Sequence, residues 1–253
     1  MDIPKSASGG VERECSVVAL LTGRGGSSLK AKNLIQICGK PVLAYPALAA
    51  RDSRIIRAWY CSSDDKGILD AAEGYGYRKI ERPEEISGPS SQHVDAIRHA
   101  IDCMHNDGCD PEIVVVLLAN NVSVKTEWID DCLNMMLADP SVSAVVPVYE
   151  DNDHHPLRAK RLLVGGFLAP FIMSQEDKVS SNRQDLEKCF FLCHNFWCIR
   201  VSAVRSGHGY PPWSFMGNRV VPYVVDKTVD IHDAYDVKMA KDWLESNQED
   251  DKR

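Results

Sequence analysis

The segment from Val17 to Pro41 limits the fold of this chain more than any other part of the sequence. An apolar run over 17–21 is followed at once by a glycine- and serine-rich stretch. A short apolar run bounded by turn residues predicts a buried parallel strand. The loop after such a strand lies at the carboxyl edge of the sheet, where open α/β folds bind their ligands. The glycine spacing matches neither a P-loop nor the dinucleotide-binding pattern.

The composition of this loop suits a polyphosphate ligand. Its glycines are Gly23, Gly25 and Gly26, and its cations are Arg24, Lys30 and Lys32. The glycines let the backbone approach a ligand closely, and their N–H groups are expected to form an anion-binding nest. The alternative is a solvated basic turn after a core strand, because glycine-rich turns with a few cations are common.

Length and charge narrow the class of protein. The 253 residues predict one large domain with a small insertion. A net charge of −7 argues against nucleic acid or an anionic membrane surface as partner. No apolar run approaches the length of a membrane span, and residues 1–14 are polar, unlike a signal peptide. We therefore expect a cytoplasmic protein.

Nine cysteines without a C-x-x-C pair are typical of buried thiols in a reducing compartment. One cluster, formed by Cys189, Cys193, His194 and Cys198, contains ligands that zinc accepts. It lies within an apolar, strand-like run, where cysteine packs as a small hydrophobic residue. Core packing is therefore the favoured interpretation of this cluster.

Apolar runs and helical patterns alternate along the chain. Strands are predicted at 16–21, 55–61, 77–80, 113–118, 143–148, 191–199 and 220–225, and helices at 43–52, 66–74, 91–105, 126–137 and 233–245. This alternation predicts an α/β fold, with a mostly parallel open sheet and helices on both faces. The predicted domain covers 15–246, the ends 1–14 and 247–253 are expected to be flexible, and the irregular segment 149–188 is interpreted as an inserted arm.

A series of motifs in the chain resembles one enzyme family. In order, these are Arg24-Gly25-Gly26-Ser27, Lys32-Asn33, Gly39-Lys40-Pro41, Cys61-Ser62-Ser63-Asp64-Asp65, Glu81-Arg82-Pro83-Glu84-Glu85-Ile86, Ser181-Asn182-Arg183-Gln184-Asp185-Leu186, His194-Asn195 and Val229-Asp230-Ile231. They resemble motifs of the cytidylyltransferases that make CMP-activated sugar acids, the acylneuraminate family. The resemblance implies a Rossmann-like nucleotidyltransferase fold whose inserted arm dimerises.

The resemblance also implies roles for individual residues. Arg24 and Lys32 correspond to the catalytic, phosphate-binding cations, which would stabilise the departing pyrophosphate. The nucleotide-binding set is Gly23, Gly25, Gly26, Ser27, Lys30, Asn33 and Arg82. Lys30 takes the place of the lysine that normally follows the serine. Asp64 and Asp65 are expected to cap the following helix.

The acceptor motif departs from the family pattern. The family's Q-P-T-S-P-L-R falls on 119–125, so Ala119 replaces a glutamine that helps to bind the acceptor sugar acid. The side chains expected to bind the acceptor are Asn120, Asn121, Arg183, Gln184 and Asn195. Asn120 and Asn121 are alternatively caps of the helix at 126, and His154 and His155 stay open candidates.

The metal motif D-I-D of the family becomes Asp230-Ile231-His232 here. Asp230 is expected to bind Mg²⁺, with His232 as a second candidate because alternate residues of an extended segment face the same way. Histidine is a poor ligand for this hard cation, so His232 is alternatively a base. Asp233 is expected to cap the last helix.

We therefore expect a Mg²⁺-dependent homodimeric enzyme that transfers CMP from CTP to an acidic small molecule and releases pyrophosphate. The acceptor would be a sialic-acid-like nonulosonic acid or a phosphonate. One alternative is an enzyme of the same fold that uses another nucleoside triphosphate or a sugar phosphate. A second is a catalytically silent relative that only binds nucleotide.

Overall fold

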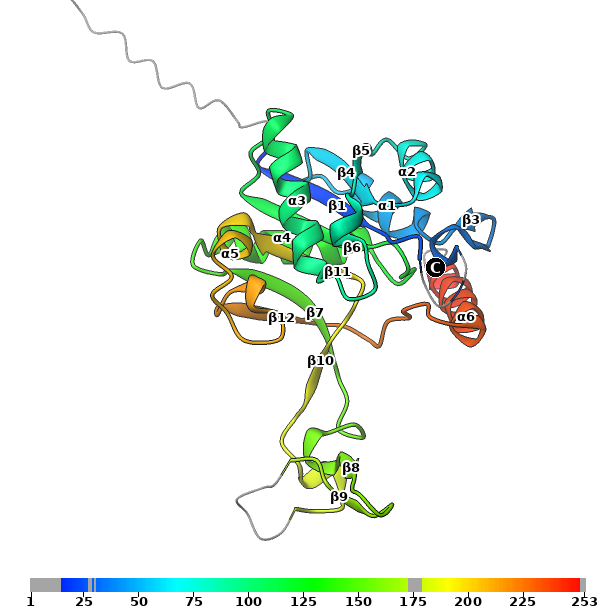
Figure 1. Ribbon diagram of the computed structural model, residues 1–253, viewed down its shortest axis with the longest axis vertical. Helices are drawn as coiled ribbons and strands as arrows, with labels where there is room; N and C mark the ends of the chain where they lie inside the picture. The colour runs from blue at the N-terminus through cyan, green and yellow to red at the C-terminus, as the bar shows by residue number, and fades with distance from the viewer. Residues whose placement is uncertain (1–14, 27–28, 30, 173–178, 251–253) are drawn as a thin grey trace, which may run out of the picture.

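The computed structural model describes residues 15–26, 29, 31–172 and 179–250. These residues form a layered body, from which a narrow arm projects at one side (Figure 1). No helix within the described residues is long and apolar enough to cross a membrane.

An eight-stranded sheet forms the middle layer. Its strands are β1 (Val17–Thr22), β4 (Ala58–Ser63), β5 (Arg78–Glu81), β6 (Ile113–Leu118), β7 (Ala144–Glu150), β10 (Phe190–Leu192), β11 (Phe196–Arg200) and β12 (Val220–Val224). They are arranged in the order β10-β7-β11-β6-β1-β4-β5, with β12 also paired to β7. β1 lies parallel to β4 and β6, whereas β11 runs antiparallel to β6 and β7. The sheet is therefore mixed but mostly parallel, as predicted.

Helices cover both faces of the sheet. They are α1 (Ala44–Arg51), α2 (Lys66–Glu73), α3 (His93–Asn106), α4 (Thr126–Ala138), α5 (Val201–Ser206) and α6 (Ala234–Asp250). Side chains of β1 alternate between two cores, since successive strand residues face opposite ways. Val17, Ala19 and Leu21 belong to the core shared with α1, α2 and α4. Val18 and Leu20 belong to the core shared with α3 and α5.

Two predicted elements differ from the structure. The expected strand 191–199 is divided into β10 and β11, because residues 193–195 turn from the arm into the body. Asn195 stabilises this turn: its Oδ1 accepts from the N–H of Phe196 at 2.7 Å, and its Nδ2 donates to Ser123 O at 3.0 Å. The expected flexible end is also wrong over 247–250, where α6 continues.

A small hairpin and α6 lie beside the carboxyl edge of the sheet. The hairpin joins β2 (Gln36–Ile37) to β3 (Lys40–Pro41). Its two turn residues, Cys38 and Gly39, have φ values of 47° and 80°, the left-handed geometry of a two-residue hairpin turn. A third apolar cluster packs the hairpin against α6; its buried members are Ile37, Val42, Val122, Ile231, Ala240 and Leu244. This packing brings the last helix close to the glycine-rich loop.

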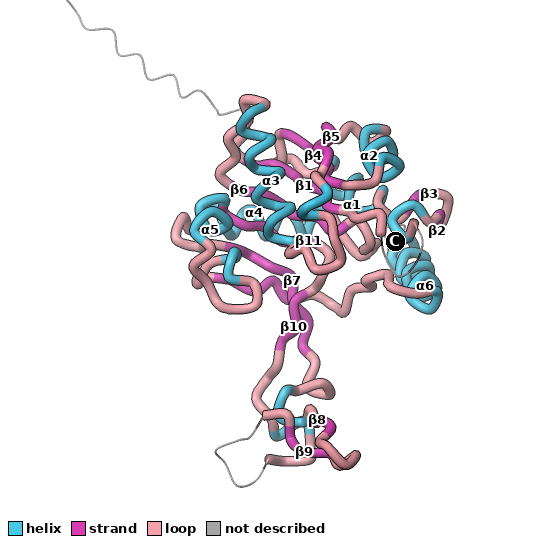
Figure 2. Tube along the Cα trace, in the orientation of Figure 1, coloured by secondary structure: helices cyan, strands magenta, loops and turns pink. Residues whose placement is uncertain are grey.

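The arm is the chain between β7 and β10. It contains two short 3₁₀ helices, Pro156–Arg158 and Arg183–Asp185, and the hairpin of β8 (Lys160–Leu162) and β9 (Leu168–Pro170). Figures 1 and 2 show it extending away from the sheet. Large apolar side chains of the arm are exposed, namely Leu162, Leu163, Val164, Phe167, Leu168, Phe171 and Ile172.

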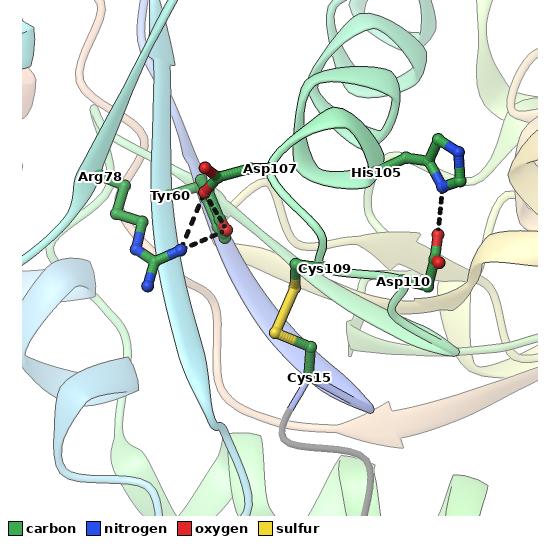
Figure 3. The surroundings of a disulfide bond; sticks show 7 residues. All are labelled: Cys15, Tyr60, Arg78, His105, Asp107, Cys109 and Asp110. Atoms are coloured by element: carbon green, nitrogen blue, oxygen red, sulfur yellow. Dashed lines mark hydrogen bonds and ion pairs between the residues drawn. A yellow bond between two sulfur atoms is a disulfide. The ribbon is translucent and has the colours of Figure 1, made fainter.

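The cysteines are only partly as expected. Cys61, Cys132, Cys193 and Cys198 are buried thiols. Cys15 and Cys109, however, form a disulfide (Figure 3). Cys15 precedes β1 and Cys109 precedes β6, and the two strands are paired neighbours, so their preceding residues lie together. The expectation of a wholly reduced set is therefore wrong, and the cytoplasmic location inferred from it stays a prediction.

Candidate functional site

The glycine-rich loop opens onto a cavity at the carboxyl edge of the sheet. The cavity has a volume of about 190 Å³ and is lined by Thr22, Gly23, Arg24, Lys32, Asn33, Arg82, His93, Leu118 and Asn120. Most of these residues lie at the carboxyl ends of β1, β5 and β6 or just after them. Lys32 and Asn33 belong to the short 3₁₀ helix Lys32–Leu34, and His93 begins α3. Parallel strands place their carboxyl ends side by side, which brings together residues far apart in the sequence.

Two cations of the loop lie at this cavity. Arg24 donates from Nη1 to Gly88 O at 2.7 Å and from Nε to Gly26 O at 3.0 Å. Lys32 donates from Nζ to Ile231 O at 3.0 Å. Burial lowers the pKa of Lys32, and the neighbouring carboxylate of Asp230 offsets part of that effect. Both catalytic candidates therefore face one cavity, held there by backbone carbonyls.

Asn33 and Arg82 line the same cavity. Asn33 is buried and donates from Nδ2 to Arg24 O at 3.3 Å. Arg82 donates from Nη2 to Ser62 O at 2.8 Å and from Nε to Ser62 Oγ at 3.3 Å. Burial lowers the pKa of the Arg82 guanidinium, and the nearby Asp64 carboxylate opposes that effect. The two predicted nucleoside contacts are thus fixed before any ligand binds.

Two of the three loop glycines expected to form an anion-binding nest have their N–H groups engaged within the protein. The N–H of Gly23 donates to Ser62 O at 3.2 Å, and that of Gly25 donates to Asp64 Oδ1 at 3.1 Å. Because both groups are engaged within the protein, side-chain cations dominate the anion site. Asp65, as predicted, caps α2 by accepting from Ile68 N at 3.1 Å. Ser27 and Lys30 lie outside the described residues.

The sequence analysis did not identify His93, which lines the same cavity. Its Nε2 lies 3.0 Å from Thr22 Oγ1, and Thr22 donates its hydroxyl proton to Leu117 O at 3.0 Å. Desolvation lowers the pKa of His93 to about 4, with smaller contributions from Arg82 and His194. His93 is therefore neutral near pH 7. No motif marks this position, so only the fold places it at the site.

A larger cavity of about 740 Å³ adjoins the first one. It is lined by Tyr149, Leu192, Cys193, His194, Lys227, Thr228, Val229, Asp230, Tyr235, Asp236, Met239, Asp242, Trp243 and Ser246. Asn120 lines the smaller cavity and donates from Nδ2 to Asp230 Oδ1 at the border of the larger one. The two cavities therefore meet at the hydrogen-bonded pair of Asn120 and Asp230.

Asp230 fits the role of a magnesium ligand. Its Oδ2 lies 3.0 Å from His232 Nε2, and its carboxylate is 25% exposed. Magnesium at nucleotide sites is usually held by one or two carboxylates together with phosphate oxygens. Within the part of the chain that the structure describes, no three His, Cys, Asp or Glu side chains gather into a metal site. Oxygen atoms of the ligand and of water would therefore complete the coordination.

Asn121 and Asn195, two of the residues expected to bind the acceptor, are buried within the protein. Asn121 is fully buried, donating from Nδ2 to His194 O at 3.0 Å and accepting from Ser123 N at 2.8 Å. Asn121 therefore braces the same buried turn as Asn195, and neither Asn120 nor Asn121 caps α4. Asp233 does cap α6, accepting from Tyr235 N at 2.7 Å.

Arg183 and Gln184 lie on the arm, outside both cavities. Arg183 pairs through Nη1 with Asp153 Oδ2 at 2.5 Å, and both side chains are exposed. His154, also in the arm, pairs with Asp151 at 2.7 Å. Within the described chain, the structure thus does not bring these arm residues to the cavity at the glycine-rich loop.

The chain is similar to several known cytidylyltransferases. The family model for cytidylyltransferases matches residues 18–164. A 3-deoxy-manno-octulosonate cytidylyltransferase of Hahella chejuensis is 32% identical over 117 residues, covering 46% of this chain and 43% of that protein. An N-acylneuraminate cytidylyltransferase of Oncorhynchus mykiss is 24% identical over 220 residues, covering 85% of this chain and 48% of that protein. The chain thus aligns with less than half the length of these relatives.

Solved structures show the same fold. A CMP:2-keto-3-deoxy-manno-octonic acid synthetase complexed with CTP has a TM-score of 0.66 at 13% identity, covering 92% of this chain and 99% of that one. A 4-diphosphocytidyl-2C-methyl-D-erythritol synthase from Anaerococcus prevotii has a TM-score of 0.63 at 13% identity, covering 92% of this chain and 97% of that one. The family match spans more than half of the chain and includes the loop, Arg82 and His93. The chain therefore belongs to the cytidylyltransferase family.

Proposed function

We propose that this protein transfers CMP from CTP to an acidic small molecule and releases pyrophosphate. The observation that supports this function best is the cavity shared by Arg24, Lys32, Asn33 and Arg82. Four residues from three segments of the chain meet there, and three of them are cationic residues in a protein of net charge −7. Such a concentration of cations suits a triphosphate. The cytidylyltransferase relatives indicate CTP as the nucleotide.

The geometry suggests how the residues act. In this reaction an acceptor oxygen attacks the α-phosphorus in line, and pyrophosphate leaves from the opposite side. Arg24 and Lys32 would neutralise the charge that grows on the leaving phosphates. Asn33 and Arg82 would hold the nucleoside so that the α-phosphorus faces the acceptor. Asp230 would hold Mg²⁺, whose charge would further neutralise the phosphates.

The acceptor is proposed to bind in the larger cavity, next to Asp230. Lys227 and His194 offer groups that can bind an acidic acceptor, and Lys227 Nζ lies 5.5 Å from the ring centre of Tyr149. Trp243 and Tyr235 provide flat apolar surface of the kind that packs on sugar rings. Relatives that use sialic, octulosonic and pseudaminic acids support a sugar acid, and a phosphonate is the alternative.

A screen of nucleotides and acceptors tests this function. Pyrophosphate release is measured with CTP, UTP, ATP and GTP against a panel of sugar acids and phosphonates, and the CMP adduct is identified by mass. Turnover with CTP supports the proposal. Turnover with another nucleotide only would favour a different nucleotidyltransferase, and tight binding without turnover on any acceptor would favour a silent relative.

The metal assignment is tested separately with Asp230→Asn. This change keeps the shape of the side chain and removes the charge that binds Mg²⁺. We expect activity to fall by about a hundredfold or more, with metal-free CTP binding little changed. His232→Asp restores the family's second carboxylate and should leave the enzyme active. Full activity of Asp230→Asn, or activity without any divalent ion, would contradict the assignment.

A further inference from the structure

His93 carries an inference that goes beyond the proposed function. It is the first residue of α3, its ring lines the nucleotide cavity, and the ring centre lies 5.6 Å from that of Trp197. Packing against Trp197 on one side and bonding to Thr22 on the other fix the position of the ring. The side chain is thus presented to a ligand in one orientation.

The proton positions around Thr22 determine which tautomer His93 adopts. A threonine hydroxyl has a single proton, and that of Thr22 is donated to Leu117 O. Thr22 Oγ1 can therefore only accept from His93 Nε2, which lies 3.0 Å away. In a neutral imidazole, a protonated Nε2 leaves Nδ1 as a hydrogen-bond acceptor.

The acceptor nitrogen is left for a ligand. Within the described chain, the hydrogen bonds of His93 involve only Thr22. Nδ1 is not among the buried polar atoms without a partner, so it keeps some exposure, and the residue that carries it lines the cavity. Desolvation of the ring, with smaller contributions from Arg82 and His194, disfavours an imidazolium and keeps Nδ1 unprotonated.

We propose that His93, in the tautomer imposed by Thr22, selects cytosine over uracil. The proposal rests on the function above, in which the cavity holds a pyrimidine nucleotide. Cytosine presents an amino group at C4, which donates to Nδ1. Uracil presents a carbonyl oxygen there, and its lone pairs would face the lone pair of Nδ1. With uracil, two hydrogen-bond acceptors would face each other and both would stay unpaired. The free-energy cost of these unpaired buried groups makes the site favour cytosine.

Two variants separate this selection from simple packing. His93→Leu fills similar space but removes the acceptor, and Thr22→Val keeps the shape of Thr22 but frees the imidazole to adopt the other tautomer. The exposed His105, at the far end of the same helix and paired with Asp110, supplies the control His105→Gln. For each protein, kcat/KM is measured with CTP and with UTP by pyrophosphate release, and folding is checked by thermal denaturation.

The ratio of CTP to UTP efficiency is the decisive readout. We expect it to fall by about tenfold or more in His93→Leu and in Thr22→Val, and to stay unchanged in His105→Gln. An unchanged ratio in both folded site variants would overturn the inference, even if their activity drops. If the wild-type protein shows no turnover, the proposed function fails. The dissociation constants of CTP and UTP, measured by calorimetry, then give the same ratio and decide the role of His93.

Discussion

At the nucleotide cavity, the effect of a single side chain depends on its charge and on its protonation state. Lys32 illustrates both, because burial lowers its pKa while the carboxylate of Asp230 favours the charged form. Arg24 lies at the same cavity and is held by hydrogen bonds to the carbonyl oxygens of Gly26 and Gly88. The charge of Lys32 is thus coupled to the carboxylate beside it.

Removing either cation should reduce turnover strongly. We expect Arg24→Ala and Lys32→Ala to lower kcat/KM with CTP by about a hundredfold or more, because each removes a charge that stabilises the departing pyrophosphate. Lys238→Ala, an exposed lysine on α6, serves as the control. Steady-state pyrophosphate release measures the effect, and near wild-type rates in both folded site variants would refute the phosphate-binding role.

His93 should make stability depend on pH. Its pKa is about 4 in the folded protein, against about 6.5 when unfolded, chiefly because the ring is desolvated near Arg82 and His194. The unfolded chain therefore binds more protons between these values. As pH falls from 6.5 to 4, the folded state should lose up to about 3 kcal/mol through this group.

Urea denaturation at several pH values measures that loss. His93→Gln should show a shallower decline between pH 6.5 and 4 than the wild type, since glutamine does not titrate. Other groups still contribute to the pH dependence of both proteins, so the difference between the two curves is the quantity to compare. Parallel curves would show that His93 titrates normally in the folded protein.

At the scale of elements, the glycine-rich loop and the start of α2 are fitted together. A Cβ on Gly25 would lie 2.7 Å from Asp65 Oδ2 and 2.9 Å from Asp65 Cβ, whereas a Cβ on Gly26 would meet nothing within 4 Å. Asp65 is also the residue that caps α2. The close approach of the loop to Asp65 explains why glycine is required at position 25.

This contrast gives a matched pair of variants. Gly25→Ala should displace Asp65 from the cap and destabilise the protein by about 1 kcal/mol, or a few degrees in Tm. Gly26→Ala should leave Tm nearly unchanged, because the added methyl group enters open space. Thermal denaturation without ligand is the measurement, and equal Tm values for the two variants would contradict the fit described here.

At the scale of the whole molecule, the arm exposes an apolar surface that a lone chain leaves in water. Patches of this kind usually mark an interface. We propose that the arm joins two copies into a homodimer, as the family resemblance implies. Phe167→Glu combined with Phe171→Glu should then yield monomers by light scattering at micromolar concentration. Tyr210→Glu, an exposed aromatic residue outside the arm, should remain dimeric. A monomeric wild type would refute the proposal.

Much of the architecture was predictable because its signals are local. Apolar runs such as 113–118 give β6 its observed bounds, and capping residues such as Asp65 mark helix starts. The division of 191–199 was not predictable, since it depends on hydrogen bonds between Asn195 and a distant loop. His93 was missed for a related reason: its role follows from Thr22, 71 positions away in the chain. Such long-range contacts leave no pattern in the sequence.

The Cys15–Cys109 bond has a topological consequence for the molecule. It closes residues 15–109, 94 positions apart, into a covalent ring. The ring contains Arg24, Lys32, Arg82 and His93. A protease that cuts the backbone once inside this ring would produce two ends but not two pieces. The nicked protein would migrate as a single species in electrophoresis until a thiol reductant separates the fragments.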